Sequence, residues 1–413
     1  MRKEDRYTRA ARKAKIRNGV IGAAVISLAV GGWGTYTMYR NRHMTEMMME
    51  AVKQENEGTS DSENGYGAEH GESGNAVADV GRSERGSADD STALAWDGTG
   101  NVPIAPGQKE EQTADPRDLN LMPVLADNLV KYHGKTYRRN QYIKAILCMG
   151  VDRSDTMTDS KDLGAAGQSD GIFLIAQDTA RHSLKILMIP RDTMTEIPIT
   201  NEERTLQDTK ITQLTMAYAY GDGREQSCEN TVQSVSKLLS GFSIDQYLAV
   251  DTTVVARLNN AVGGVTVTIP TDGMEKKDPA FVKGEQVTLH GSQAEAFVRY
   301  RDITRDFSAL YRMDQQQEYI TQYFKAVKAA ARTDSQIVTH LFDLIQDYMV
   351  TDMDKSQYLK IAMDGLEAGS LTSADFYTVP GSGETTETYD VYRADRQAVI
   401  PIILNLFYRE DGQ

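Results

Sequence analysis

Several residue types and motifs that carry enzyme chemistry are scarce or missing in this chain of 413 residues. It has only two cysteines, Cys148 and Cys228, and neither lies in a pattern typical of a catalytic Cys/His pair. Its six histidines form no cluster with ligand spacing, and no HExxH or P-loop motif occurs. These absences argue against a cysteine nucleophile, a zinc site and a P-loop nucleotide site.

Positive charge is also in short supply, since the formal net charge is −14 at pH 7. This balance argues against a general nucleic-acid-binding protein. Residues 1–17 carry eight Lys or Arg against two acidic residues, a net charge of +6; subtracting this from −14 leaves −20 for the rest. The length and the hydrophobic content of 40% allow one large folded domain with additional segments.

One stretch, residues 19–39, has no charged residue at all. Its length suits a helix that crosses a bilayer, and the basic flank predicts that residues 1–18 stay in the cytoplasm. Trp33, Tyr36 and Tyr39 lie at its far end, where an interfacial aromatic belt would be. We therefore expect a single-pass signal anchor in the cell membrane, with the C-terminal domain extracellular. A cleaved signal peptide and a soluble buried helix are the alternatives.

Residues 40–116 have the composition of a disordered acidic tether. From Gly58 to Pro116 the chain is rich in Gly, Ser, Asp, Glu, Ala and Asn. It has too few apolar residues to bury a core, so we expect no fold of its own. The tether would hold the folded part, residues 117–413, away from the membrane.

Apolar runs bounded by charged residues mark the beginning of the folded part. Three runs have the length and content of buried strands: residues 143–150, 171–177 and 184–190. Asp152 and Arg153 follow the first run, Asp170 precedes the second and Arg191 follows the third. Open sheets bind ligands at strand ends, so these residues are candidates for a site.

The rest of the folded part combines helical and strand patterns. Helices are predicted at residues 211–220, 228–239, 253–261, 314–331, 335–349, 355–367 and 395–408, and strands at 247–250 and 265–269. This mixture predicts an α/β fold, a three-layer α/β/α sandwich with a mixed central sheet, behind one N-terminal transmembrane helix. Cys148 falls in a strand and Cys228 begins a helix, so two buried free thiols are expected, with one disulfide as the alternative.

A group of arginines lies within residues 291–317. Arg299 and Arg301 are two positions apart, and in an extended segment both guanidinium groups would lie on one face. Two neighbouring guanidinium groups suit a phosphate or pyrophosphate better than a single carboxylate. The alternative is a solvated loop or a surface ion-pair network with Asp302 and Asp306.

Several motifs in a fixed order give the chain a resemblance to a known family. They are GVDR, QSDGIFLIAQD, LKILMIPRDT, DTKIT with MAYAYG, LNNAVGGVTVTI, and VRYRD followed by DFSALYRMDQQQ. In this order the sequence resembles the LytR-CpsA-Psr family, strongly over about residues 143–330, with residues 331–413 as a C-terminal helical extension. The resemblance implies a Mg²⁺-dependent phosphotransferase of cell-wall biogenesis, which moves a glycopolymer from a polyprenyl-pyrophosphate carrier to peptidoglycan.

The resemblance also implies roles for individual residues. Asp152 and Asp170 would hold Mg²⁺ at the pyrophosphate, and a role of Asp152 as base on the acceptor hydroxyl competes with its role as ligand. The remaining implied residues are Arg191, Arg299 and Arg301 as catalytic groups, and Arg153, Lys210, Asp306, Arg312 and Gln316 as substrate-binding groups. Phosphoryl transfer needs charge neutralisation and alignment, and carboxylates suit a hard cation, so the chemistry agrees.

Three positions depart from the family pattern. Gln168 and Gln315 stand where many members have Arg, and Thr212 replaces a frequent Asn. Fewer positive charges imply a weaker hold on pyrophosphate, unless Arg153 or Arg305 compensates.

Two other functional classes stay open. A hydrolase of polyprenyl-pyrophosphate-linked lipids would use the same residues with water as acceptor. A non-catalytic wall protein that binds lipid-linked sugars would keep the arginines without needing Mg²⁺. A DNA-binding regulator is disfavoured by the predicted anchor and the acidic domain. The polymer also stays open between teichoic acid, capsule and another glycan.

Overall fold

The computed structural model describes residues 123–411, apart from 126–127, 154–156, 161–163, 202, 204 and 388. The predicted cytoplasmic segment, signal anchor and tether, at residues 1–18, 19–39 and 40–116, lie outside the described residues. Throughout the described part, every helix is too short or too polar to cross a bilayer.

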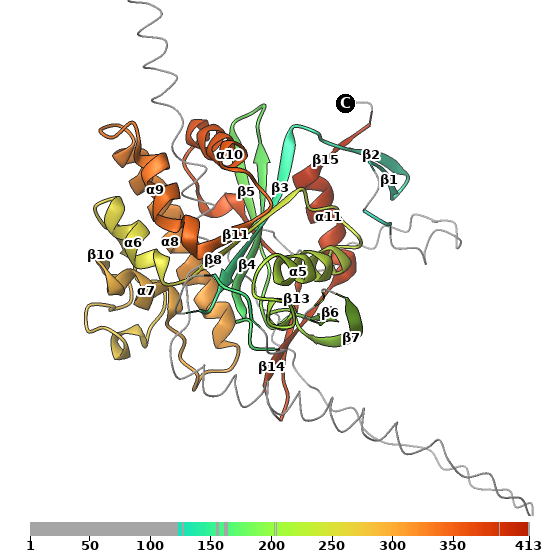
Figure 1. Ribbon diagram of the computed structural model, residues 1–413, viewed down its shortest axis with the longest axis horizontal. Coiled ribbons are helices and arrows are strands. Elements are labelled where there is room, and N and C mark those ends of the chain that lie inside the picture. The colour runs from blue at the N-terminus through green and yellow to red at the C-terminus, as the bar shows by residue number, and fades with distance from the viewer. Residues whose placement is uncertain are drawn as a thin grey trace, which may run out of the picture. The chain divides into compact units, whose positions relative to one another are not determined.

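Six strands form the central sheet, in the order β11-β8-β3-β4-β5-β12 (Figure 1). The pairs β3–β8 and β5–β12 are parallel, and the pairs β3–β4, β4–β5 and β8–β11 are antiparallel. The sheet is therefore mixed, as the sequence predicts. The strands span Ile143–Val151 (β3), Ser169–Asp178 (β4), Ser183–Met188 (β5), Gln246–Asp251 (β8), Met349–Thr351 (β11) and Phe376–Thr378 (β12).

Helices cover both faces of this sheet. Ile146 and Cys148 of β3 face one hydrophobic core, while Leu147 and Met149 face the other. A strand buried on both faces reads as a continuous apolar run, which is why these strands could be recognised in the sequence. The first face packs against α6 (Val254–Ala261), α7 (Ser292–Arg299), α8 (Ser308–Ala330), α9 (Ile337–Ile345) and α10 (Lys355–Glu367), and the second against α4 (Met216–Ala219), α5 (Glu225–Leu238) and α11 (Arg396–Phe407).

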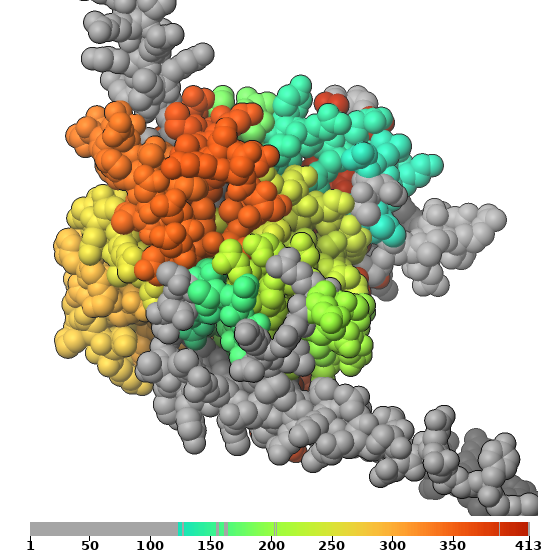
Figure 2. Space-filling model, in the orientation of Figure 1, coloured from blue at the N-terminus to red at the C-terminus, as the bar shows by residue number. Residues whose placement is uncertain are grey.

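The helices of the first face pack on one another as well as on the sheet. Helix α9 contacts both α6 and α10, and Figure 2 shows the yellow surface of α6 adjoining the orange surface of α9 and α10. The two cores confirm the predicted three-layer α/β/α arrangement.

The two cysteines are both buried and both free, as expected. Cys148 belongs to the core on one face of the sheet and Cys228 to the core on the other. Because the sheet separates them, the alternative of a disulfide between them is wrong.

One predicted helix is wrong. Residues 211–220 were expected to be helical, but Leu206–Gln213 is strand β7, which pairs antiparallel with β6 (Met194–Thr200), and only α4 is helical. The β-branched residues Thr209, Ile211 and Thr212 fit the strand, and the missed neighbour β6 supplies its hydrogen-bonding partner.

Short strands outside the central sheet complete the described fold. They form a three-stranded sheet and two further antiparallel pairs. They are β1 (Leu129–Tyr132), β2 (Lys135–Arg139), β9 (Val265–Thr268), β10 (Gln286–Leu289), β13 (Gly381–Thr385), β14 (Asp390–Ala394) and β15 (Tyr408–Glu410).

Candidate functional site

Three strands of the central sheet bring their charged neighbours to one edge. Strands β3 and β4 are antiparallel and Val151 pairs with Ser169, so Asp152 and Asp170 lie at the same end of the pair. Strand β5 runs antiparallel to β4 and ends at this edge too, and Arg191 follows it. The charged residues that follow or begin these strands therefore lie together, at the place where open sheets bind ligands.

Asp170 is the most deeply buried carboxylate at this edge. It forms an ion pair with Arg191, and its Oδ2 lies 3.7 Å from Arg312 Nη1. The exposed fractions of the three side chains are 0% for Asp170, 4% for Arg191 and 1% for Arg312. Arg312 Nη2 also donates to the main-chain oxygen of Asp170 at 3.2 Å. Charges so deeply buried persist only when they are paired and hydrogen-bonded.

Arg191 is held by two further side chains. Its Nη2 donates to Gln168 Oε1 at 2.9 Å, and its Nε lies 3.2 Å from Asp192 Oδ1. Gln168 is one of the departures from the family pattern. A neutral amide at this position orients Arg191 without placing a second cation beside it.

Asp152 and Arg299 form the outer part of the site. Arg299 Nη2 donates to Asp152 Oδ1 at 2.8 Å, and Arg299 also pairs with Glu295. Burial and the nearby charge of Asp170 raise the pKa of Asp152 to about 7, against the opposing effect of Arg299 and Arg191. A carboxyl group with a pKa near neutrality can act as a general base.

Arg301 reaches the same group of charges from a loop. Its Nε donates to Ser308 Oγ at 2.5 Å, and its Nη2 lies 3.8 Å from Asp390 Oδ2. Burial lowers the pKa of Arg301, while Asp192, Asp390 and Asp170 act in the opposite direction. We call Asp152, Asp170, Arg191, Arg299, Arg301 and Arg312 the charged cluster.

The expected geometry of the arginine pair needs a correction. Arg299 is the last residue of α7, and Tyr300 leaves the helix with φ −59° and ψ 132°. Arg299 and Arg301 therefore do not lie on one extended strand, and they contact different partners. The surface ion-pair alternative is not met either, because both side chains are less than 15% exposed.

Gln315 hydrogen-bonds to the C-terminal end of α7, which carries Arg299. In the amide orientation that satisfies its hydrogen bonds, its nitrogen donates to the carbonyl groups of Phe297 at 2.9 Å and Tyr300 at 3.0 Å. Gln315 is the second departure from the family pattern, and here it joins α8 to the C-terminal end of α7.

The other predicted site residues are Arg153, Gln316, Lys210 and Asp306. Arg153 follows Asp152, and its guanidinium donates to the main-chain and side-chain oxygens of Thr158 at 2.9 and 3.2 Å. Gln316 is buried one turn after Arg312 in α8. Within the described residues, no hydrogen bond or ion pair joins Lys210 or Asp306 to the charged cluster; Lys210 lies in β7, and Asp306 is exposed before α8.

Sequence reasoning missed several residues that hold the charged cluster. Asp192 follows Arg191 in the PRDT motif and could have been included on that ground. Glu295 lies four residues before Arg299 on the same helix, a spacing that signals an ion pair. Ser308 and Asp390 have no local signal, because only the fold brings them to Arg301.

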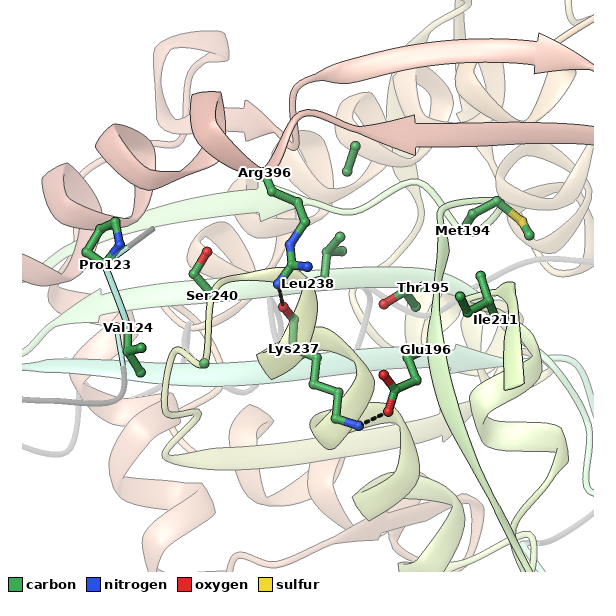
Figure 3. A pocket seen from close by; sticks show the side chains of 12 residues that line it. Pro123, Val124, Met194, Thr195, Glu196, Ile211, Lys237, Leu238, Ser240 and Arg396 are labelled. Atoms are coloured by element: carbon green, nitrogen blue, oxygen red, sulfur yellow. Dashed lines mark hydrogen bonds and ion pairs between the residues drawn. The ribbon is translucent and has the colours of Figure 1, made fainter. Parts of the chain in front are cut away.

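A cavity of about 590 Å³ lies elsewhere in the described part of the chain. Figure 3 shows two basic residues that line it: Lys237 pairs with Glu196, and Arg396 Nη2 donates to the Lys237 main-chain oxygen at 2.6 Å. Ile211 and Met194 add apolar lining, and no member of the charged cluster lines the cavity. We therefore place the candidate site at the charged cluster.

Two known proteins share part of this sequence. The TagV protein of Bacillus subtilis, named a polyisoprenyl-teichoic acid–peptidoglycan teichoic acid transferase, is 31% identical over 195 residues, which are 45% of this chain and 44% of that protein. The Bacillus cereus TagU protein of the same activity name is 27% identical over 57% of this chain and 73% of that protein. The match thus spans less than half the length of the first relative.

A solved structure supports the fold. The crystal structure of protein gbs0355 from Streptococcus agalactiae has a TM-score of 0.51 and 21% identity, and the match covers 64% of this chain and 86% of that one. The sequence model of the LytR_cpsA_psr family matches residues 113–404, which is most of the chain and includes the whole charged cluster. The chain belongs to the LytR_cpsA_psr family.

Proposed function

We propose that this protein is a phosphotransferase that moves a glycopolymer from a polyprenyl-pyrophosphate carrier to peptidoglycan. The observation that carries the proposal is the convergence of two carboxylates and four guanidinium groups at one edge of the sheet. Guanidinium groups present paired N–H donors that match the oxygens of a pyrophosphate. The names of the two relatives describe the same reaction with teichoic acid as the polymer.

The charged cluster has a deep part and an outer part. Asp170, Arg191 and Arg312 are almost completely buried, while Asp152, Arg299 and Arg301 keep 13–19% of their side chains exposed. The outer groups would contact the pyrophosphate. The deep groups Asp170 and Arg312 would hold Arg191 in place and contribute to the electrostatic field of the site.

The reaction would be an in-line displacement at phosphorus. An acceptor hydroxyl of peptidoglycan attacks the phosphorus that carries the sugar, and a new phosphorus–oxygen bond forms. The bond from this phosphorus to the bridging oxygen breaks, so polyprenyl phosphate leaves and the sugar stays joined through a phosphodiester. Asp152 takes the hydroxyl proton, and the guanidinium groups stabilise the charge that develops on the phosphate oxygens.

The residues also fit a magnesium ion. Asp152 and Asp170 are close enough for the charge of one to raise the pKa of the other, and Asp170 Oδ2 accepts no hydrogen bond within the described residues. The described residues hold no group of three or more His, Cys, Asp or Glu that could bind a metal. Two carboxylates suffice for Mg²⁺ when phosphate and water oxygens complete the shell, and the ion would neutralise pyrophosphate charge.

A membrane anchor belongs to the same proposal. Residues 19–39 would span the cell membrane, with residues 1–18 in the cytoplasm and the tether and folded domain outside. The uncharged segment and its basic flank support this topology. Protease added to intact cells should cleave within residues 60–110, and protection of that region would contradict the topology.

Product analysis tests the transferase proposal. The full-length protein in detergent, given a polyprenyl-pyrophosphate-linked saccharide, Mg²⁺ and peptidoglycan, should attach the saccharide covalently to peptidoglycan. Arg299→Ala should lose this activity, whereas Arg396→Ala, a matched loss of one arginine outside the charged cluster, should keep it. Release of saccharide into solution without attachment would favour a hydrolase.

A further inference from the structure

The β13–β14 hairpin contacts the loop that carries Arg301. Asp390, the first residue of β14, accepts a hydrogen bond from the Phe307 main-chain nitrogen at 3.0 Å through Oδ2. The same oxygen lies 3.8 Å from Arg301 Nη2. Thr385 Oγ1 donates to the other carboxylate oxygen of Asp390 at 3.1 Å, which fixes the side chain from within the hairpin.

A second contact locks the loop against the hairpin. A Cβ atom added to Gly383 of β13 would lie 2.3 Å from the nearest carbon of the Phe307 ring, so only glycine leaves room for this ring. Phe307 has φ 52°, a left-handed conformation that is rare for a bulky residue and needs support from its surroundings. The ring and the main chain of Phe307 are thus both held by the hairpin.

The hairpin is anchored on the other side of the site as well. Gln213 Nε2 donates to the Asp390 main-chain oxygen at 2.8 Å, and the Tyr392 nitrogen donates to the Asp192 main-chain oxygen at 2.9 Å. Asp192 follows Arg191, so the hairpin joins the two segments that supply Arg191 and Arg301.

Asp390 acts on Arg301 by two routes. Its carboxylate is the near counter-charge of one guanidinium nitrogen. It also holds Phe307, and the next residue, Ser308, accepts the hydrogen bond from Arg301 Nε. Two contacts of the guanidinium, with the carboxylate of Asp390 and with Ser308, therefore depend on Asp390.

We infer that the β13–β14 hairpin is a clamp that sets the position of Arg301 for the transfer reaction, with Asp390 as the positioning residue. The inference rests on the proposed function. Asp390 itself reaches the substrate only through Arg301, so its loss misplaces a group that remains present. A displacement of about 1 Å of a group that stabilises the transition state can lower the rate by about a hundredfold.

Three hairpin variants test the clamp by their transfer rates. Asp390→Ala should lower kcat/KM by about ten- to a hundredfold. Asp390→Asn keeps an acceptor for the Phe307 nitrogen and should recover part of the loss. Glu384→Gln removes a carboxylate of the same hairpin that pairs with the exposed Arg393, and should leave the rate unchanged. Equal rates for Asp390→Ala and wild type would overturn the inference.

A double-mutant cycle separates positioning from general structural support. In an Arg301→Ala background, Asp390→Ala should cost less than about twofold, because its effect passes through a side chain that is no longer there. If the rate loss of the double variant equals the product of the two single losses, Asp390 does not act through Arg301, and the positioning role is overturned.

A readout without turnover distinguishes failure of the clamp from failure of the proposed function. Amide hydrogen exchange at Phe307 should speed up in Asp390→Ala and stay unchanged in Glu384→Gln. Unchanged exchange at Phe307 overturns the clamp, whatever the transfer rates. A wild-type protein without transfer activity overturns the proposed function, and faster exchange in that case still supports the clamp.

Discussion

Single residues in the charged cluster differ in what their removal leaves behind. Asp170 is an ion-pair partner of two buried arginines, whereas Asp152 shares Arg299 with Glu295. Removing one partner of a buried ion pair leaves an uncompensated charge, which costs more than the pair itself contributes. Loss of Asp170 should therefore lower both stability and activity, whereas loss of Asp152 should lower activity alone.

Asp152→Ala should abolish Mg²⁺-dependent transfer and leave the fold nearly intact. The substitution removes one proposed metal ligand and the proposed base, while Arg299 keeps its ion pair with Glu295. Transfer assays at several Mg²⁺ concentrations and thermal unfolding measure the two effects. A variant that turns over at the wild-type rate would refute both roles of Asp152.

Asp170→Ala should lose activity and also stability. Arg191 and Arg312 would each lose a buried counter-charge, so the free energy of unfolding should fall by roughly 3–5 kcal/mol. Denaturant unfolding of Asp170→Ala and of Asp152→Ala measures the free energy of unfolding of each variant. Equal stability of the two variants would mean that Asp170 does not compensate the buried arginines.

Arg299→Lys and Arg301→Lys should each recover only part of the function, because Lys keeps the charge and loses the planar fork. Each loss should be roughly 2–4 kcal/mol of transition-state stabilisation, or about thirty- to a thousandfold in rate. The double variant should be far from additive if both groups hold one pyrophosphate. Unchanged turnover of the double variant in a transfer assay would exclude the pyrophosphate role.

Helix α8 is the element on which the site depends most. It begins at Ser308, supplies Arg312 and Gln316 and, through Gln315, holds the end of α7. It also carries Asp314, whose pKa is raised by burial to about 6. A carboxyl group whose pKa is higher in the folded than in the unfolded state makes the stability of the protein depend on pH.

Asp314→Asn should remove part of that pH dependence. The folded pKa of about 6 exceeds the ordinary value of 3.8, so the folded state binds the proton more tightly. Stability from this group is full below about pH 4 and lost as pH rises through 6, by up to about 3 kcal/mol. The unfolding free energy of the wild type minus that of the variant should be smaller at pH 8 than at pH 4. A constant difference would contradict the raised pKa.

The elements differ in how well the sequence predicts them. The strands near Asp152, Asp170 and Arg191 are buried on both faces, and their apolar runs and charged ends reveal both the sheet and the edge where the site lies. Strand β7 could not be recognised because its first residues are exposed and its partner β6 was missed. Asp390 could not be predicted, because its place beside Arg301 depends on long-range packing.

At the scale of the whole molecule, the fold joins distant parts of the sequence at one edge of one sheet. Strand-end residues supply Asp152, Asp170 and Arg191, the α7–α8 region supplies the other arginines, and the C-terminal hairpin holds one of them. Placed outside a membrane by the proposed anchor and tether, this edge would meet a lipid-linked donor and the wall.

The fate of the donor phosphate tests the central claim most directly. A polyprenyl-pyrophosphate donor labelled with ³²P only in the sugar-linked phosphate is incubated with the full-length protein, Mg²⁺ and peptidoglycan. The account predicts that the label moves with the sugar to peptidoglycan and that unlabelled polyprenyl phosphate is released. Label that stays with the lipid while the sugar moves, or that enters solution as sugar phosphate with no attachment to peptidoglycan, would contradict it.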